Sequence, residues 1–323
     1  MAVLFTDGFD NNRPDESKKY DTVTISSVYL STGRTGNYAG MYGGFITKNL
    51  SSNHSTIVAG FALRAESSVG VASTFFKLDD NSDNQLHLRV NTSDLIEVVR
   101  GDGTILATSS GIGVSTTSWT YIEFKTTISN TGSIILKING ITDINNNSVD
   151  TQNNSNSYIN KVSIGSNTNY VYGFDDYFLD SSTFQGTVKI YTIMPNGDNS
   201  VQWTPNAGTN YNRLDEYNYQ NGDTTYVSAT LTNLKDLYDM ADADITSGVI
   251  RSVSHNFTAK KTDLNPTDVQ PIIKTSSTEY TGTTQSMTTS YSNYQTIWET
   301  NPFSGSGWTY GAIDSLIAGF QTV

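Results

Sequence analysis

The amino-acid sequence predicts an all-β protein built from antiparallel strands. Apolar and polar residues alternate with a period of two along most of the chain, as in half-buried strands. Aromatic residues are plentiful, with 19 Tyr and 13 Phe, and together with Thr they favour strands. Clusters of Asn, Gly and Ser separate the alternating runs and favour turns. Hydrophobic content is only 36%, but the recurring alternation indicates packed sheets rather than disorder.

The clearest strands lie near the middle of the chain. In the run 119–125, Ile122 and Phe124 share one side, and polar or amphipathic residues occupy the other. The run 132–140 continues the alternation and ends in the dipeptide Asn139-Gly140. Both residues of that dipeptide tolerate positive φ, so a tight hairpin turn is expected there.

Two more strand-like runs follow, at 162–165 and 174–179. The order is a strand led by Trp119, a hairpin with an Asn-Gly turn, a strand ending in Gly165, and an Asp-Asp-Tyr-Phe strand at 175–178. This order resembles the concanavalin A-like (laminin G-like) lectin fold of structural proteins from tailed bacteriophages. The resemblance implies an antiparallel jelly-roll or lectin-like β-sandwich.

Strands are also expected before this stretch, at 3–9, 20–30, 56–65, 74–78, 86–90, 95–100 and 104–107. Gly101-Asp102-Gly103 predicts a hairpin turn between the last two. The Gly-rich run 33–44 lacks the Lys-Ser/Thr pair of a phosphate-binding loop, so a wide surface loop leading into a strand is expected. The Asn/Ser run 143–157 is expected to form a long loop.

A domain boundary is expected at 181–186, between a lectin-like sandwich at 1–184 and a second β-rich domain at 185–323. Strands are expected in the second domain at 187–193, 245–259, 269–274 and 294–298. Residues 233–240 are predicted to form a helix, because Leu234, Leu237 and Tyr238 fall at helical spacing. The closing phrase Trp308-Thr309…Ile313-Asp314 also resembles phage virion proteins, which implies a role for this domain in virion attachment or assembly.

Charge and composition exclude several classes of partner. The formal net charge is −12, and no basic stripe offsets it, so neither nucleic acid nor an anionic membrane is an expected partner. There is no cysteine, and therefore no disulfide or thiolate metal site. No signal peptide or membrane-inserting run is expected from the sequence.

No catalytic constellation is visible in the sequence, and the protein is not expected to be an enzyme. Glycoside hydrolysis needs two carboxylates at a fixed separation. Glu123 lies on a suitable strand, but Lys125 and Ile128 stand where a Glu-x-Asp-x-x-Glu pattern needs acidic residues. Asp175 and Asp176 are adjacent, so on a regular strand they would point to opposite faces. The three histidines stand apart, without a triad or paired metal spacing.

Calcium is the one metal for which the sequence offers ligands; no other cofactor is expected. Asp79, Asp80 and Asp83 form a cluster of hard oxygen ligands in a predicted turn. The simpler alternative, which the residue types favour, is a hairpin turn rich in Asx hydrogen bonds. A second candidate set is Asp7, Asp10, Asp175 and Asp176, provided that their strands are neighbours.

Two groups of tyrosines are candidates for a glycan-binding surface, since lectins combine aromatic faces with Asn and Asp hydrogen bonds. The first group is Tyr170, Tyr172 and Tyr177, and the second includes Tyr217 and Tyr219. The alternative is structural, because tyrosines also cover all-β surfaces with an apolar body and a polar tip. The four tryptophans are expected in the core.

The function expected from these features is that of a bacteriophage virion structural protein, a head or tail decoration or a fibre component. It would act through contacts with other virion proteins, as a homo-oligomer, and reside in the virion after synthesis in the host cytoplasm. The alternative is a host-recognition adhesin that binds a surface glycan, and a glycan hydrolase is a weaker third hypothesis. A soluble, acidic surface fits a particle component that avoids the genome.

Overall fold

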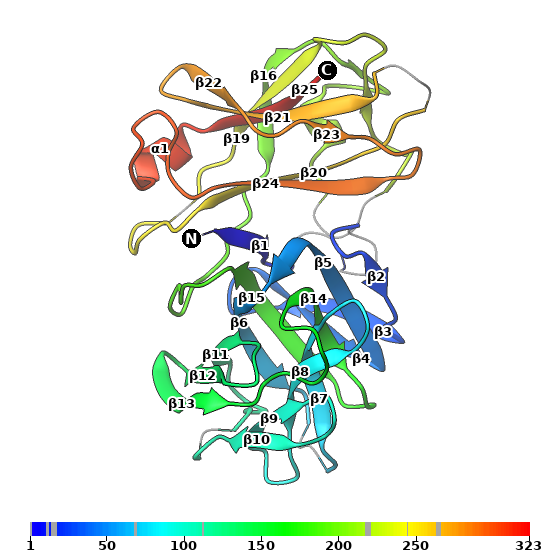
Figure 1. The fold of residues 1–323 in the computed structure, drawn as a ribbon. Helices are drawn as coiled ribbons and strands as arrows, with labels where there is room; N and C mark the ends of the chain where they lie inside the picture. Colours follow the sequence, from blue (N-terminus) through cyan, green and yellow to red (C-terminus); the bar gives the residue numbers. More distant parts are fainter. Residues whose placement is uncertain are drawn as a thin grey trace. The chain divides into compact units, whose positions relative to one another are not determined.

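The computed structural model describes residues 2–10, 13, 18–67, 70–111, 113–216, 221–243, 245–262 and 266–323. Within them almost all regular structure is β-strand, which confirms the predicted all-β class (Figure 1). The chain forms two compact units. The first unit comprises Met1–Asp15 and Tyr20–Ile190, and the second comprises Glu16–Lys19 and Tyr191–Val323. The domain limits expected from the sequence stay a prediction.

The first unit contains an eight-stranded antiparallel sheet. Across it run β13 (Ile141–Val149), β12 (Gly132–Ile138), β11 (Thr120–Thr127), β6 (Thr56–Ala65), β15 (Tyr172–Asp180), β4 (Asn37–Tyr42) and β3 (Ser27–Thr32). The eighth strand, β1 (Val3–Asp7), pairs with the later part of β15. The Gly-rich run 33–44 is thus mainly strand, rather than the wide loop expected.

A seven-stranded antiparallel sheet belongs to the same unit. Its order is β10 (Ile105–Thr108), β9 (Ile96–Arg100), β8 (Asn84–Val90), β7 (Ser73–Asp79), β14 (Ile159–Ser166), β5 (Gly44–His54) and β2 (Thr22–Val23). Buried residues from both sheets join in one hydrophobic cluster. The first unit is therefore a β-sandwich with its core between the two sheets.

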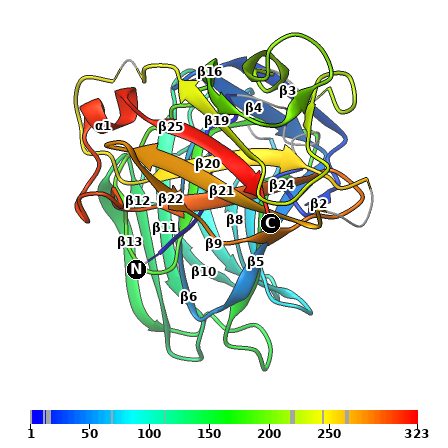
Figure 2. The same ribbon diagram turned by 90° about the horizontal axis from the view of Figure 1, so that it is seen from above.

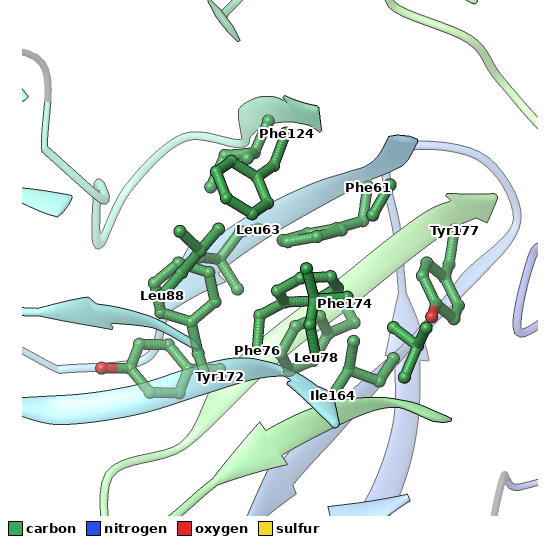
Figure 3. Packing of buried hydrophobic residues seen from close by; sticks show 14 of the residues in the cluster. Phe61, Leu63, Phe76, Leu78, Leu88, Phe124, Ile164, Tyr172, Phe174 and Tyr177 are labelled. Carbon is green, nitrogen blue, oxygen red and sulfur yellow. The ribbon is translucent and has the colours of Figure 1, made fainter. Parts of the chain in front are cut away.

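The core of the sandwich is aromatic at its centre (Figure 3). Phe61 on β6 stacks on Phe76 of β7 at 5.5 Å between ring centroids, and it also contacts Phe174 and Tyr177 of β15. Ile122 and Phe124 lie in the same cluster, on the apolar side of β11 that the alternation predicts. Tertiary packing thus follows the period-two pattern directly.

Both predicted hairpin turns are present. Asn139 has φ 50° and Gly140 has φ 83°, as a tight turn between β12 and β13 requires. Gly103 has φ 92° in the turn between β9 and β10. The prediction that the Asn/Ser run 143–157 forms a loop is wrong for its first part, because β13 pairs with β12 as far as Val149. Its polar side chains are mostly exposed, which a strand at the edge of a sheet tolerates.

The second unit is built on a six-stranded antiparallel sheet. Its path is β16 (Pro195–Val201), β19 (Lys235–Met240), β25 (Ile317–Thr322), β21 (Asp268–Thr275) and β22 (Thr278–Thr281), with β23 (Gln285–Ser286) also paired to β21. Figure 2 shows β25 between β19 and β21. Two-stranded sheets form from β17 (Thr204–Pro205) with β18 (Val227–Ser228) and from β20 (Val253–Ala259) with β24 (Ser292–Trp298).

The helix predicted over 233–240 is wrong, because β19 occupies this stretch. Leu237 and Tyr238 are both buried, and β19 pairs with β16 on one side and β25 on the other. Burial on both faces removes the alternation that marks a half-exposed strand. The one α-helix among the described residues is α1 (Tyr310–Asp314), capped by the Thr309 side chain.

Phe61→Ala is predicted to destabilise the first unit by ~3–5 kcal/mol, since it removes a fully buried ring from the centre of the core. Urea unfolding followed by near-UV circular dichroism measures the loss. Phe303→Ala is the matched control, because Phe303 is 54% exposed and its removal should change the unfolding free energy by less than ~0.5 kcal/mol. Equal effects of the two substitutions would contradict this account of the core.

Candidate functional site

The outer face of the eight-stranded sheet, opposite the core, carries a group of aromatic and charged side chains. We call it the aromatic cluster, and its members are Tyr29, Tyr38, Arg64, Glu66 and Trp119. The alternation explains their position: the strand neighbours of these residues, such as Val28, Ala39 and Leu63, belong to the core. Register then brings β3, β4, β6 and β11 together around β15.

Three rings of the cluster contact each other edge to face. The ring centroids of Tyr29 and Tyr38 are 6.1 Å apart, with an angle of 76° between the ring planes. Those of Tyr38 and Trp119 are 5.2 Å apart, with an angle of 75° between the planes. The Arg64 guanidinium carbon lies 4.9 Å from the Tyr38 ring centroid and 5.0 Å from that of Trp119. These are the distances of cation–π contacts, so Arg64 holds the two rings together.

Two glycines form the floor under these rings. A Cβ atom at Gly40 would lie 2.4 Å from Cζ of Tyr29, and one at Gly173 would lie 2.7 Å from Cε2 of Tyr38. Gly40 and Gly173 pair directly with each other between β4 and β15. The missing side chains therefore let Tyr29 and Tyr38 lie against the backbone of the sheet.

The polar part of the cluster is a shared hydrogen-bond network. Arg64 Nη2 donates to Glu66 Oε1 at 2.8 Å and to the Tyr38 hydroxyl at 3.0 Å. The Tyr38 hydroxyl donates to Glu66 Oε1 at 2.9 Å. The hydrogen bond with Glu66 raises the pKa of Arg64 further above its ordinary value, so the guanidinium stays charged. Arg64 Nη1 and Glu66 Oε2 have no partner among the described residues, so within this part of the chain one donor group and one acceptor atom are open to a ligand.

Another part of the outer face is covered by residues 183–190. Phe184 and Val188 pack against a small apolar group that contains Tyr121 and Phe178. Gly186 N donates to Glu123 Oε1 at 2.8 Å, so this carboxylate lies under the covering segment and is 1% exposed. Tyr29, by contrast, is 38% exposed. Tyr38 is 3% exposed and Trp119 is half-buried, so Tyr29 is the ring of the aromatic cluster that solvent reaches most freely.

Asp175 and Asp176 are both fully buried, because β15 does not continue as a regular strand after Asp175. The register with β6 shifts between Asp175 and Phe178, and Asp176 has φ 53°. The expectation that the two side chains point to opposite faces therefore fails at this bulge. Asp175 Oδ2 accepts from the backbone N of Arg34 and Thr35, and Oδ1 accepts from Asp176 N.

Asp176 completes the buried network. Its Oδ2 accepts from Arg34 Nη1 at 2.5 Å, and its Oδ1 accepts from Ile190 N at 2.6 Å. Arg34 Nη1 also donates to the backbone oxygen of Val188. All four carboxylate oxygens of the Asp175–Asp176 pair thus accept hydrogen bonds from the protein, and the pair ties the covering segment and the β3–β4 turn to β15.

The sequence-predicted calcium ligands form a hydrogen-bonded turn. Asp80 Oδ1 accepts from Ser82 N and Asp83 N, and its Oδ2 accepts from the side chains of Gln85, Asn154 and Asn156. Although burial opposes the shift, these bonds lower the pKa of Asp80. Asp79 accepts from Asn84, and the Asp83 side chain is exposed.

This geometry is that of the Asx-rich turn, the simpler alternative. Across the described ranges no three His, Cys, Asp or Glu residues are grouped as a metal would need. Calcium binding by Asp79, Asp80 and Asp83 stays a prediction, and an unchanged melting temperature in the presence of a chelator would count against it. The second set, Asp7 and Asp10 with Asp175 and Asp176, does come from neighbouring strands, since β1 pairs with β15.

Two of the predicted glycan-binding tyrosines are buried in the core. Tyr172 is 0% and Tyr177 1% exposed, with rings packed against Phe75 and Phe5, so neither forms a surface platform. Tyr170 is half-buried, and its hydroxyl accepts from Gly70 N. Tyr217 and Tyr219 lie outside the described residues.

The aromatic cluster was missed at the sequence level. The sequence patterns predict a loop around Tyr38 and a core position for Trp119, whereas Tyr38 lies on β4 and Trp119 is half-buried on the outer face. One signal was available: Tyr29 alternates with Val28 and Leu30, which predicts that it points away from the core. No helix in the described part of the chain is long and apolar enough to cross a membrane.

No protein-family model and no curated protein matches the sequence. Among solved structures the chain is similar to the cellulose-induced protein Cip1, at 16% identity over 55% of this chain and 97% of that chain, with TM-score 0.43. It is similar to an endo-β-1,4-glucuronan lyase from the fungus Trichoderma reesei at 11% identity over 58% and 98% of the chains, TM-score 0.44. It is also similar to the receptor-binding domain of botulinum neurotoxin C/D mosaic serotype, at 13% identity over 80% of this chain and 66% of that chain, with TM-score 0.40. These TM-scores are low and establish no shared function, so the sandwich fold stands on its own strand pairing.

The Asp175–Asp176 pair predicts a stability that falls as the pH rises toward about 8, the raised pKa of Asp175, and levels off above it. Burial and the Asp176 carboxylate raise the pKa of Asp175 to about 8, whereas an unfolded aspartate titrates near ~4. Up to that higher pKa the folded state binds more protons than the unfolded state, so the free energy of unfolding decreases with rising pH. Burial lowers the pKa values of His87 and His255 to about 4, so their effect is confined to pH below ~6.5.

Urea midpoints between about pH 6.5 and 8.5 test this prediction. The native protein should lose stability across the window, and Asp175→Asn should show a flatter profile because the titrating group is gone. Asp102→Asn is the matched control, since the Asp102 side chain is 43% exposed and pairs with Arg100 at the surface. A native profile that is level or rises over this window would refute the proton-linked burial of Asp175.

Proposed function

We propose that this protein binds glycans through the aromatic cluster on the outer face of its eight-stranded sheet. The observation that carries the proposal is the contact of three aromatic rings with an Arg64–Glu66 pair that keeps one donor and one acceptor free. Sugar rings present apolar C–H faces and hydroxyl edges at the same time. An aromatic surface bordered by a few polar groups is complementary to both.

The cluster also meets the positional requirement of a binding site. Its rings are held by paired strands and by cation–π contacts, so little conformational freedom remains to be lost on binding. Tyr29 is exposed at one end, and the Arg64 and Glu66 side chains are 23% and 28% exposed. A host surface glycan is the partner that we propose.

Tyr29→Ala and Trp119→Ala are each predicted to weaken glycan binding at least ~10-fold. Loss of one aromatic contact costs ~1–1.5 kcal/mol, which is close to a tenfold change in affinity, and displacement of the neighbouring rings adds to this cost. Binding is measured on a carbohydrate array and then by calorimetry with the best ligand. Tyr226→Ala is the matched control: Tyr226 is 39% exposed, close to the 38% of Tyr29, but belongs to the second unit.

A second variant separates ring position from ring removal. Gly173→Ala keeps every aromatic residue but places a methyl group where the Tyr38 ring lies, so it should also weaken binding. Gly307→Ala is its control, because a Cβ atom there meets nothing within 4 Å. A folded protein that binds no glycan, or one whose affinity survives all three cluster substitutions, would refute the proposed site.

We propose a virion structural role as the second candidate. It is supported by the strand order from Trp119 to Leu179, which resembles phage virion proteins and is present as β11, β12, β14 and β15. In this role the protein would assemble as a homo-oligomer on the head or tail and contact other virion proteins. Cryo-electron microscopy of intact particles tests it: ordered density for this chain would support the role, and its absence from purified particles would reject it.

A further inference from the structure

We infer that the ligand of the aromatic cluster is a neutral pyranose unit of a soluble glycan, and neither an acidic sugar nor a flat crystalline polysaccharide. This inference rests on the proposed glycan-binding function and deepens it. Three features of the cluster support it: the compensation of its charges, the exposure of its rings, and the identity of the two free polar atoms.

The charges of the cluster cancel. Arg64 Nη2 and Glu66 Oε1 are 2.8 Å apart, so the guanidinium is already neutralised by a carboxylate inside the site. Uronic and sialic acids are bound most favourably by an arginine that is free to form a bidentate pair with the ligand. The net charge of −12 adds a general repulsion of anions.

Three other cations of the outer face are engaged or distant. Arg34 pairs with the buried Asp176. Lys125 and Lys137 lie over the Phe184 ring, at 5.9 and 4.0 Å from its centroid. Lys125 is six residues along the chain from Trp119, which corresponds to roughly 20 Å on a strand. None of these cations therefore supplies the charge that an acidic sugar needs at the cluster.

The ring geometry selects against a flat surface. Binding to a crystalline polysaccharide requires several aromatic faces in one plane, so that neighbouring sugar rings stack simultaneously. Here Tyr29 is 38% exposed, whereas Trp119 is half-buried and Tyr38, inclined at 76° to Tyr29 and at 75° to Trp119, is only 3% exposed. The cluster therefore presents one exposed ring, which can stack on one sugar face, and not a row of exposed rings. This arrangement fits a single chain or a chain end.

The free polar atoms match hydroxyl groups. A hydroxyl donates and accepts, so adjacent hydroxyls can accept from Arg64 Nη1 and donate to Glu66 Oε2. A ligand carboxylate has no proton to donate and would place its charge beside that of Glu66. Carboxylate ligands thus lose one hydrogen bond and gain a repulsion, whereas neutral sugars use both atoms.

The experiment compares one neutral oligosaccharide, chosen from those bound on the array, with its counterpart oxidised to the uronic acid at the same linkage. Calorimetry of the full-length protein should give at least ~10-fold tighter binding of the neutral form, equivalent to ~1.4 kcal/mol. In Glu66→Gln the Arg64 charge is no longer compensated, so this ratio should shrink or invert, and more so at low salt. Insoluble crystalline cellulose should not retain the protein.

Glu279→Gln is the control, because Glu279 is also ion-paired, with Lys235, but lies in the second unit. It should leave the neutral-to-acidic ratio at the native value. The inference is overturned if the native protein prefers the uronic form, if Glu66→Gln leaves the ratio unchanged, or if crystalline cellulose retains the protein while soluble chains do not. Absence of binding to every glycan overturns the proposed function itself, which is a different result.

Discussion

The close approach of aromatic rings to glycine backbone on the outer face of the eight-stranded sheet is the contact on which the candidate site depends. A side chain at Gly40 or Gly173 would occupy the space of Tyr29 or Tyr38. Because the rings lie where side chains are missing, the register of the strands sets their positions. Sites positioned by paired strands are more rigid than sites carried on loops, so the free edges of Arg64 and Glu66 face solvent in a defined geometry.

Strand β15 links this outer face to the core. Phe174 points into the sandwich, while its neighbour Gly173 lies under the Tyr38 ring. After Asp175 the bulge restarts the alternation, and Phe178 emerges on the outer face against Gly60. Bulges redirect side chains in this way and are costly unless the freed groups find partners. The buried hydrogen bonds of the Asp175–Asp176 pair supply those partners, so the charge network stabilises the strand that carries the site.

Local patterns predicted much of the fold, and non-local pairing decided the rest. The turn at Asn139-Gly140 and the inward side of β11 depend on φ preferences and on a period of two, both of which are written in a few consecutive residues. Residues 233–240 are the opposite case. Over so short a run the spacing of Leu237 and Tyr238 fits a helix as well as a strand buried on both faces. Only the pairing of β19 with β16 and β25 distinguishes them.

The candidate site was harder to predict because its members lie far apart in the sequence. Tyrosine content alone does not distinguish a binding surface from a core: Tyr172 and Tyr177 are buried, whereas Tyr29 is exposed. What separates them is the face of the sheet on which each residue falls and the side chain that stands opposite on the next strand. A glycine opposite an aromatic residue opens room for a ring to lie flat, but that pairing is visible only once the register is known. The candidate site therefore depends on register as much as on residue type, and in the proposed function the Arg64–Glu66 pair would determine which sugars the exposed Tyr29 ring accepts.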